Sequence, residues 1–325
     1  MKKIAIVFFV LISLFTIQAC TTQYESYDVY STVYPIQFLV ERIGENVVSS
    51  GLVPGVTNHH DSVDWSAQDI KAMINADFLF YVGVGFDPYI DQKFVELFQN
   101  RPVQLIKIET AKDQENQPYV ELIEGVVHDH EHANESEIHG TDSELGMDPH
   151  FWMSPKRMIQ AARLVYETLI QKYPSNQSTL QNNYQVLVSQ LTALSAQLQS
   201  AVDNQSKMVL TATNIYGYLR VDYGFDSLSI SPGYHEETEQ FTVQEKDEIV
   251  QEAIYHQIKY ILYEKNTSSP LSNSIFQALE TQGHQPVKLE YHILHNLFQD
   301  DYQNNRDYFS IMTQNISLLQ TAMTE

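Results

Sequence analysis

The chain has 325 residues, of which 43% are hydrophobic and 11% aromatic, so it can bury the core of one large domain or two medium-sized domains. Its 19 lysines and arginines stand against 41 aspartates and glutamates, which gives a formal net charge of −22. This charge excludes electrostatic attraction to nucleic acid or to an anionic membrane surface, because both are themselves negatively charged.

The chain begins with a segment typical of secretion. Met1-Lys2-Lys3 is a short basic region, and the nearly unbroken apolar run Ile4–Ile17 is too short for a membrane-spanning helix. An alanine directly precedes Cys20, the single cysteine of the chain, and this pattern resembles a bacterial lipobox. An ordinary signal peptide with an incidental thiol is the alternative. We expect residues 1–19 to be a lipoprotein signal peptide and residues 20–28 to be a lipidated cysteine with a polar tether, which anchors the protein without spanning the membrane.

The first half of the remaining chain alternates strand-like and helix-like segments. Ser66-x-x-Asp69 is typical of a capping box and predicts a helix that continues to Asn75. Ser154-Pro155 predicts an N-cap and a first-turn proline, opening a helix to about Gln171. Short apolar runs predict four strands, at 29–33, 47–53, 78–82 and 103–108.

One long helix is predicted in the middle of the chain. No glycine or proline occurs from Ser175 to Ile215, so nothing there interrupts a helix. Its apolar residues recur at a spacing of four and three, which places them on one face over about 40 Å of helix. These residues are Leu180, Tyr184, Leu187, Leu191, Leu194 and Leu198. We expect residues 175–205 to form a linker between two domains.

The alternation of strands and helices resumes after this linker. Thr242-x-x-Glu245 is a second capping-box pattern, and Gly283 suits the end of a helix. The predicted strands are 208–212, 228–230, 260–263 and 287–289, and the predicted helices are roughly 242–257, 272–282 and 302–323.

Strand–helix alternation on both sides of the linker predicts an α/β fold with two lobes. Each lobe should contain a mainly parallel sheet flanked by helices, with an N-terminal lobe at 29–174 and a C-terminal lobe at 206–325. Ligands of open α/β sheets bind beyond the carboxyl ends of the strands. The cleft between the lobes is therefore the expected ligand site.

Histidines are concentrated in the segment from Val126 to Pro155, which holds five of the 12 in the chain. One of the five, His150, lies in the sequence GMDPHFWMSP. The other four lie among acidic residues in a predicted loop at 125–147: His128, His130, His132 and His139. Imidazole and carboxylate groups are the ligands that divalent transition metals prefer, so the segment predicts metal binding. A solvated acidic loop that merely carries histidine is the alternative.

Three motifs together resemble one protein family. Asp148–Pro155 is close to D-P-H-x-W-x-[DS]-P, Leu52–Ile70 contains a proline-glycine loop followed by His59-His60, and Tyr216-Gly217-Tyr218 resembles F-G-Y. These residues resemble those of the metal-binding lipoproteins of bacterial zinc/manganese ABC importers, the cluster A-I solute-binding proteins. The resemblance covers essentially the whole mature chain. It implies two α/β lobes, a rigid linking helix and a metal held between the lobes by four side chains.

The resemblance also implies metal ligands, and two of the usual four are missing. His150 matches the second ligand, and His59 or His60 matches the first. The third ligand should fall on Thr213, which is a poor zinc ligand. The fourth, normally a carboxylate, should fall near Tyr291-His292, where no aspartate stands.

Replacements for the missing ligands are expected on nearby loops of the second lobe. His235 follows a predicted strand and a proline-glycine turn, although a surface histidine in a turn is the alternative. His292 is favoured over His295 for the fourth position. Glu236 or Glu237 could also serve, and Glu264 is expected to support the ligands from behind, as Glu236 could. A site dominated by histidine favours Zn²⁺, with Mn²⁺ possible.

The resemblance implies the extracytoplasmic component of an ABC importer, which captures Zn²⁺ and delivers it to a membrane permease with its ATPase. We expect a monomer anchored through Cys20 to the surface of a Gram-positive bacterium. The histidine-rich loop would capture zinc weakly and pass it to the cleft, or sense saturation. The alternatives are a manganese or iron protein of the same family and a surface adhesin with a structural metal. An enzyme is not expected, because the chain contains neither H-E-x-x-H nor G-x-S-x-G.

Overall fold

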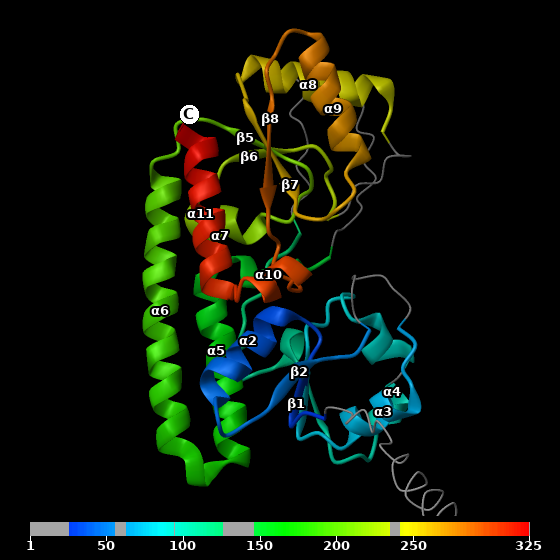
Figure 1. Ribbon diagram of the computed structural model, residues 1–325, viewed down its shortest axis with the longest axis vertical. Coiled ribbons are helices and arrows are strands. Elements are labelled where there is room, and N and C mark those ends of the chain that lie inside the picture. Colours follow the sequence, from blue (N-terminus) through cyan, green and yellow to red (C-terminus); the bar gives the residue numbers. More distant parts are fainter. Residues whose placement is uncertain (1–25, 56–62, 94, 126–145, 235–240, 325) are drawn as a thin grey trace, which may run out of the picture.

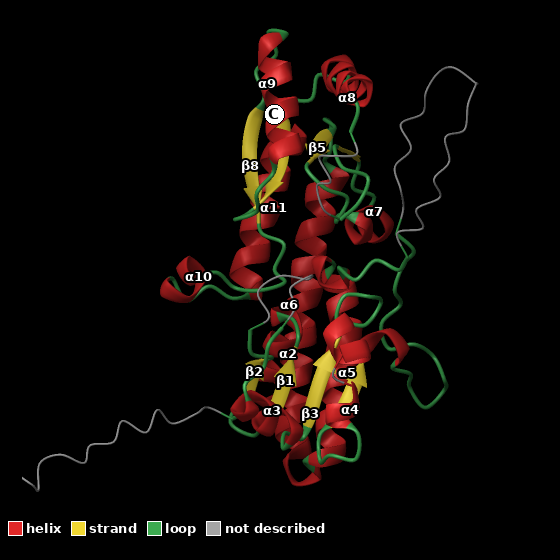
Figure 2. Ribbon diagram, turned by 90° about the vertical axis from the view of Figure 1, so that its right-hand side faces the viewer, coloured by secondary structure: helices red, strands yellow, loops and turns green. Residues whose placement is uncertain are grey.

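The computed structural model describes residues 26–55, 63–93, 95–125, 146–234 and 241–324. Within these ranges the chain forms two lobes, one below the other, with long helices running along one side of both (Figure 1). Seen from the side, the two sheets lie towards opposite ends of the molecule (Figure 2). The segments 1–25, 56–62, 126–145 and 235–240 lie outside this description, as do residues 94 and 325.

The first lobe is built on a parallel sheet with the strand order β2-β1-β3-β4. Every residue of β3 is buried, as expected for a strand of a parallel sheet that is covered on both faces. The strands are β1 (Val29–Ser31), β2 (Ser50–Leu52), β3 (Phe78–Tyr81) and β4 (Gln104–Lys107), and the helices of this lobe are α2 (Tyr34–Gly44), α3 (Ala67–Ile74) and α4 (Val95–Phe98). In register, Tyr30 of β1 lies opposite Gly51 and Leu79.

The second lobe repeats this arrangement, with the strand order β6-β5-β7-β8 and parallel pairing throughout. Its elements are β5 (Val209–Thr211), α7 (Gly217–Tyr223), β6 (Ser227–Ser229), α8 (Val243–Tyr255), β7 (Tyr260–Glu264), α9 (Pro270–Thr281) and β8 (Val287–Tyr291). The eight strands overlap the eight predicted ones. The predicted fold class, two lobes with parallel sheets flanked by helices, is confirmed.

Long helices connect the lobes. α5 (Pro155–Lys172) leads into α6 (Gln177–Asp203), which spans about 40 Å at 1.5 Å per residue and runs beside both lobes (Figure 1). The five leucines of the predicted stripe on α6 are all buried, whereas Tyr184 is partly exposed and stacks on Tyr166 with 4.6 Å between ring centroids. The five leucines therefore lie on one buried face of α6, and their predicted placement on a single face is consistent with this.

The prediction of a single C-terminal helix at 302–323 is wrong in one respect, because the segment forms two helices. α10 (Gln299–Gln303) is followed by its C-cap Asn304, and α11 (Tyr308–Thr324) begins four residues after that cap. Asn305 between them has φ +50°, in the left-handed region, which interrupts the helical backbone. The predicted capping boxes at Ser66 and Thr242 and the N-cap at Ser154 are confirmed.

The largest hydrophobic core runs through both lobes without interruption. It includes Val29 and Phe80 in the first sheet, Trp152 and Tyr308 between the lobes, and Leu262 in the second sheet. The two lobes are therefore packed against each other by buried side chains. Among the described helices, none combines the length and the apolar composition that a bilayer crossing requires.

Candidate metal centre

The carboxyl ends of the two sheets meet between the lobes. Tyr34, which opens α2 just beyond β1, donates its backbone N–H to the backbone oxygen of His295, just beyond β8, at 2.8 Å. Between them lies Trp152, whose indole Nε1 donates to the backbone oxygen of Ile293 at 2.8 Å. The D-P-H segment therefore lies where the sequence predicts a ligand site.

His150 is the central side chain of this region, and Asp148 orients it. A single carboxylate oxygen, Oδ1 of Asp148, accepts hydrogen bonds from both the backbone N–H and the ring Nδ1 of His150, each at 2.8 Å. Both residues are almost completely buried, with 2% and 1% of their surfaces exposed. A proton on Nδ1 suits this contact and would make Nε2 the metal-binding nitrogen, as in other carboxylate-supported histidines. The role of Asp148 is not evident from the sequence pattern.

Aromatic rings surround the His150 imidazole. Ring centroids of Tyr234, Trp152 and Phe86 lie 5.1, 5.4 and 6.3 Å from it. Phe86 belongs to the first lobe and Tyr234 to the second, so His150 lies at the contact between the lobes. These rings limit the access of water to the imidazole on several sides.

Several predicted site residues lie outside the described residues. His59 and His60 fall in 56–62, between Gly55 and Val63, while Trp65 Nε1 donates to the backbone oxygen of Pro54 at 3.0 Å across this gap. His235, Glu236 and Glu237 fall just after Tyr234. The remaining predicted residues that lie outside are Cys20 and the loop histidines His128, His130, His132 and His139.

His292 is buried in a hydrogen-bond network that occupies both of its ring nitrogens. Nε2 lies 2.9 Å from Oδ2 of Asp301, and Nδ1 accepts the backbone N–H of Leu294 at 2.9 Å. Asp301 has no exposed surface and also contacts Arg306, with 3.1 Å between Nη1 and Oδ1. In this arrangement His292 has no lone pair directed at a metal, so the geometry does not favour the predicted ligand role.

The same network fixes the backbone that leads to His295. Leu294 has φ +65°, a conformation that is uncommon for a residue other than glycine. The contact with His292 Nδ1 holds its N–H in this strained position, and Tyr34 holds the backbone oxygen of His295 on the other side. Strained residues persist only where their surroundings over-determine them, and they are frequent at functional sites. The hydrogen bonds made by His292 and Tyr34 therefore fix the backbone on either side of His295.

Thr213 and Glu264 form a buried pair at the ends of β5 and β7. The Thr213 hydroxyl donates to Glu264 Oε1, and the two residues are 3% and 7% exposed. Thr213 is the residue on which the family resemblance places the third ligand, and its hydroxyl is occupied by the bond to Glu264. Within the described ranges, no group of three or more histidine, cysteine, aspartate or glutamate side chains is close enough to hold a metal ion.

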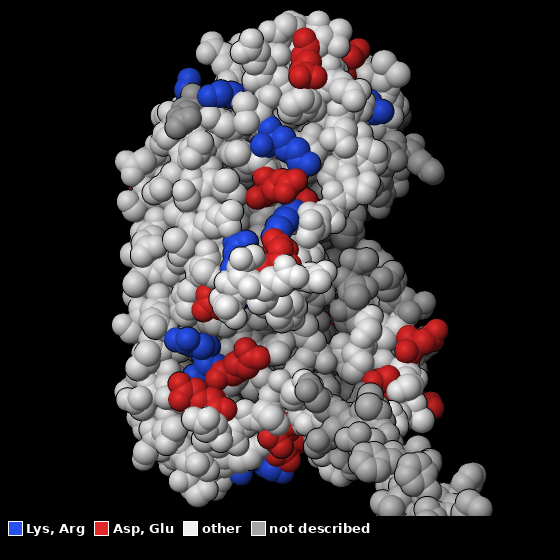
Figure 3. Space-filling model, viewed as in Figure 1, with Lys and Arg blue, Asp and Glu red and all other residues white. Residues whose placement is uncertain are grey.

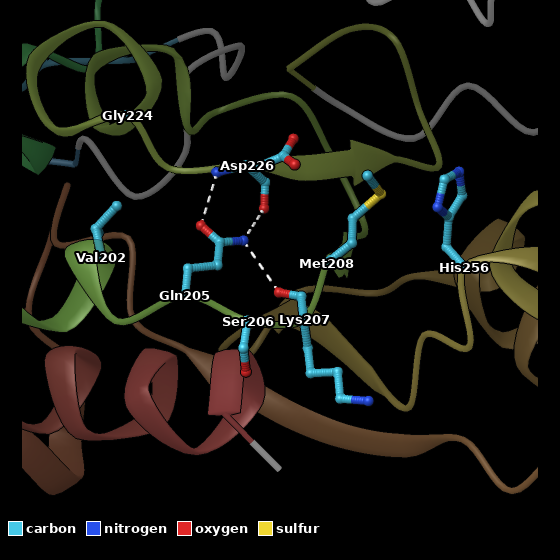
Figure 4. Close-up of a pocket in the computed structure, with 8 residues that line it drawn as sticks. All are labelled: Val202, Gln205, Ser206, Lys207, Met208, Gly224, Asp226 and His256. Atoms are coloured by element: carbon cyan, nitrogen blue, oxygen red, sulfur yellow. Dashed lines mark hydrogen bonds between the residues drawn. The ribbon is translucent and has the colours of Figure 1, made fainter.

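Positively and negatively charged residues lie next to one another over the middle of the face shown in Figure 3. Lys265 pairs with Asp300 at 2.6 Å and lies 3.4 Å from Asp301. A pocket of about 540 Å³ lies elsewhere, at the amino end of the second sheet, and Figure 4 shows its lining. The lining residues are Val202, Gln205, Ser206, Lys207, Met208, Gly224, Asp226 and His256. Because β5 begins beside Met208 and ends towards the lobe contact, this pocket is separate from His150.

The His292–Asp301 network makes stability dependent on pH. Burial lowers the pKa of His292 below 6.5 and outweighs the opposing effect of Asp301. Burial alone would raise the pKa of Asp301, but the Phe298 amide and His292 lower it further, so its pKa lies below 3.8. Just below pH 6.5 and again just below pH 3.8, the unfolded chain therefore binds more protons than the folded chain. Lowering the pH through either range favours unfolding.

We therefore expect the free energy of unfolding of the metal-free protein to fall as the pH drops through 6.5, and to fall again through 3.8. Urea unfolding at a series of pH values measures this. A His292→Gln variant should lack the first decline, because glutamine does not titrate. A wild-type profile that is flat between neutral pH and the carboxylate range would contradict the assignment.

Comparisons with known proteins agree with this fold. Residues 29–322 match the family described as zinc-uptake complex component A, periplasmic. The zinc-binding lipoprotein AdcA of Streptococcus pneumoniae serotype 4 is 25% identical over 325 residues, covering 98% of this chain and 60% of AdcA. The metal ABC transporter substrate-binding lipoprotein SsaB of Streptococcus sanguinis is 25% identical over 240 residues, covering 71% of this chain and 72% of SsaB. The chain thus spans about 60% of the length of AdcA.

Solved structures share the fold. The Zn(II)-bound ZnuA-like domain of Streptococcus pneumoniae AdcA superimposes with a TM-score of 0.68 at 18% identity, covering 93% of this chain and 100% of that domain. The periplasmic zinc-binding protein TroA of Treponema pallidum gives 0.69 at 19% identity, with coverage of 93% and 100%. Since the family match extends over nearly all of the described structure, the chain belongs to the ZnuA family, the component A proteins of zinc-uptake complexes.

Proposed function

We propose that this protein is the extracytoplasmic zinc-binding component of an ABC importer, and that it delivers zinc to a membrane permease driven by an ATPase. The observation that carries the proposal is the buried His150, oriented by Asp148 at the contact between two lobes. Relatives named as zinc-binding lipoproteins support it. In this proposal zinc is cargo, the protein is a lipid-anchored monomer held through Cys20, and it has no catalytic role.

Three further donors are proposed to complete the site around His150. His235 is favoured because the chain passes Tyr234, whose ring lies 5.1 Å from that of His150, immediately before residue 235. His59 or His60 is proposed from the first lobe, within the seven residues that join Gly55 to Val63. Glu236 or Glu237 is an alternative donor next to His235.

The fourth donor is proposed to be His295, with His292 as the residue that positions it. Both ring nitrogens of His292 are hydrogen-bonded, one to Asp301 and one to the strained backbone of Leu294. A metal could replace one of these bonds only by releasing the network. His295 is the residue after Leu294, and its backbone oxygen accepts the N–H of Tyr34 at the lobe contact. The usual third position is filled by Thr213 bonded to Glu264, which we propose as a supporting pair.

The proposed donor set is dominated by imidazole, which favours zinc over manganese, since manganese prefers oxygen ligands. Ligating histidines must be neutral, so zinc affinity should fall as the pH drops through the histidine range. Because one core joins the lobes, loading is proposed to rearrange side chains at their contact instead of swinging the lobes apart.

Competitive titration of the metal-free protein (residues 21–325) with zinc and manganese tests the function, with bound ions counted by mass spectrometry. We expect one tightly bound zinc ion, further weakly bound zinc ions on the histidine-rich loop, and negligible manganese. Deleting residues 127–139 should remove the weakly bound ions and leave the tight one. Tight manganese with weak zinc would instead indicate carboxylate donors and a manganese importer of the same family.

A further inference from the structure

The amino end of α7, in the second lobe, is packed directly on Asp148. The Tyr218 hydroxyl donates to the backbone oxygen of Asp148 at 2.8 Å and accepts the backbone N–H of Ile123 at 3.3 Å. Asp148 itself donates its N–H to the backbone oxygen of Ile123 at 2.8 Å. Tyr218 is fully buried, so a single phenol oxygen joins two segments of the first lobe to α7.

Gly217 lies against the carboxylate of Asp148. A Cβ atom added at Gly217 would lie 2.6 Å from Oδ2 of Asp148 and 3.2 Å from Cδ1 of Ile123. The first distance is shorter than a van der Waals contact allows. The other oxygen of this carboxylate, Oδ1, holds His150 through two hydrogen bonds. The carboxylate therefore fits between the His150 ring and a residue that has no side chain.

The position of α7 is itself fixed by an ion pair. Asp222 of α7 accepts a hydrogen bond from the Ser154 hydroxyl at 2.6 Å, and its Oδ1 lies 2.6 Å from Nη2 of Arg157. The Asp222 and Arg157 side chains are 7% and 9% exposed. Displacing α7 to relieve a clash at Gly217 would break this buried pair, so the carboxylate of Asp148 would turn instead.

We propose that Gly217 and Tyr218 are positioning residues for metal binding, which act through Asp148 on the orientation of the His150 ring. The inference rests on the proposed function only in taking His150 as a zinc donor. In this proposal the second lobe contributes to zinc binding by orienting His150, although Thr213 stands at the position of its usual ligand. Replacing Gly217 by alanine turns the Asp148 carboxylate, weakens its bond to Nδ1, and lets the imidazole adopt other tautomers and orientations.

Zinc affinities of Gly217→Ala, Asp148→Ala and the double variant test this proposal as a cycle. Loss of such supporting contacts typically weakens metal binding about 10- to 100-fold, and we expect this for each single variant. The double variant should bind zinc no more weakly than Asp148→Ala, because the methyl group then fills vacated space. Two losses that multiply in the double variant, or a Gly217→Ala protein with wild-type affinity, would overturn the proposal.

Gly224 at the other end of α7 supplies the matched control. Its φ is +78°, and an added Cβ meets nothing within 4 Å, so Gly224→Ala strains the backbone without reaching Asp148. It should lower the melting temperature and leave zinc affinity unchanged. If Gly217→Ala does not fold, Tyr218→Phe removes only the hydroxyl and should weaken zinc binding in the same direction; unchanged affinity there would count against the proposal.

A metal-free measurement separates this inference from the proposed function. In the ¹⁵N spectrum of the wild type, His150 should show a protonated Nδ1 and an unprotonated Nε2, because Asp148 accepts from Nδ1. In Gly217→Ala the two tautomers should mix. Failure of the wild type to bind zinc would reject the proposed function, whereas an unaltered His150 spectrum in Gly217→Ala would reject the positioning role.

Discussion

Replacing His150 by alanine is expected to weaken zinc binding by about 100- to 1000-fold. Zinc sites with four protein ligands contribute about 10 to 16 kcal/mol, so one ligand in four accounts for roughly 3 to 4 kcal/mol, and every 1.4 kcal/mol is a factor of about ten. Competition with a chelator of known affinity measures the loss. Within two positions of His150 in the sequence, only Asp148 has a side chain that could bind zinc in place of the lost ring. Asp148 already faces Nδ1 of that ring.

His256→Ala is the appropriate control for this loss. That histidine is on the surface, 37% exposed, and pairs with Glu252 one helical turn earlier at 3.3 Å. Its removal should not change the affinity of the tight site. His295→Ala should resemble His150→Ala, while His292→Ala should act mainly on stability. A His150→Ala protein that binds zinc as tightly as the wild type would remove the basis of the proposed site.

Replacing Asp301 by alanine is expected to destabilise the metal-free protein by about 3 to 5 kcal/mol, the usual cost of breaking a buried charge network on one side. Asp301 has no exposed surface and accepts hydrogen bonds from the Phe298 amide and from His292, each at 2.9 Å. Its removal also leaves the side chains of Arg306 and Lys265 without their buried partner. The free energy of unfolding in urea measures the effect.

Asp300→Ala makes a matched comparison, since the two aspartates are neighbours and both contact Lys265. Asp300 is 53% exposed, and exposed ion pairs contribute only about 0 to 1 kcal/mol. A small effect at position 300 with a large one at 301 would show that burial of the network matters. Equal effects at both positions would mean that the network is not what stabilises this segment.

Much of the fold could be predicted from local sequence signals. Capping boxes at Ser66 and Thr242 marked two helix starts correctly, because those side chains bond their own first turn. No side-chain hydrogen bond caps α2 or α7, and only α2 carries another start signal, Pro35 in its first turn. The break between α10 and α11 depends on a single positive φ at Asn305, which no spacing of apolar residues reveals.

The site could be predicted only in part, for a similar reason. The D-P-H pattern located His150, but the carboxylate that orients it is identified only by distances. The preference for His292 over His295 rested on position alone. It took no account of Asp301, nine residues further on, which engages His292 Nε2. The contacts of His292 with Asp301 and of His295 with Tyr34 depend on the folded structure, and the spacing of the histidines in the sequence does not reveal them.

The shared core means that the two lobes form one cooperative unit. Trp152 and Tyr308 lie in the same buried cluster as Val29 of the first sheet and Leu262 of the second. Cutting the chain within α6 would therefore expose a large apolar surface on each fragment. Any ion bound at the lobe contact would stabilise the folded state as a whole by mass action. Ion binding should then protect α2 and α7, whose buried side chains both belong to this cluster, from proteolysis together.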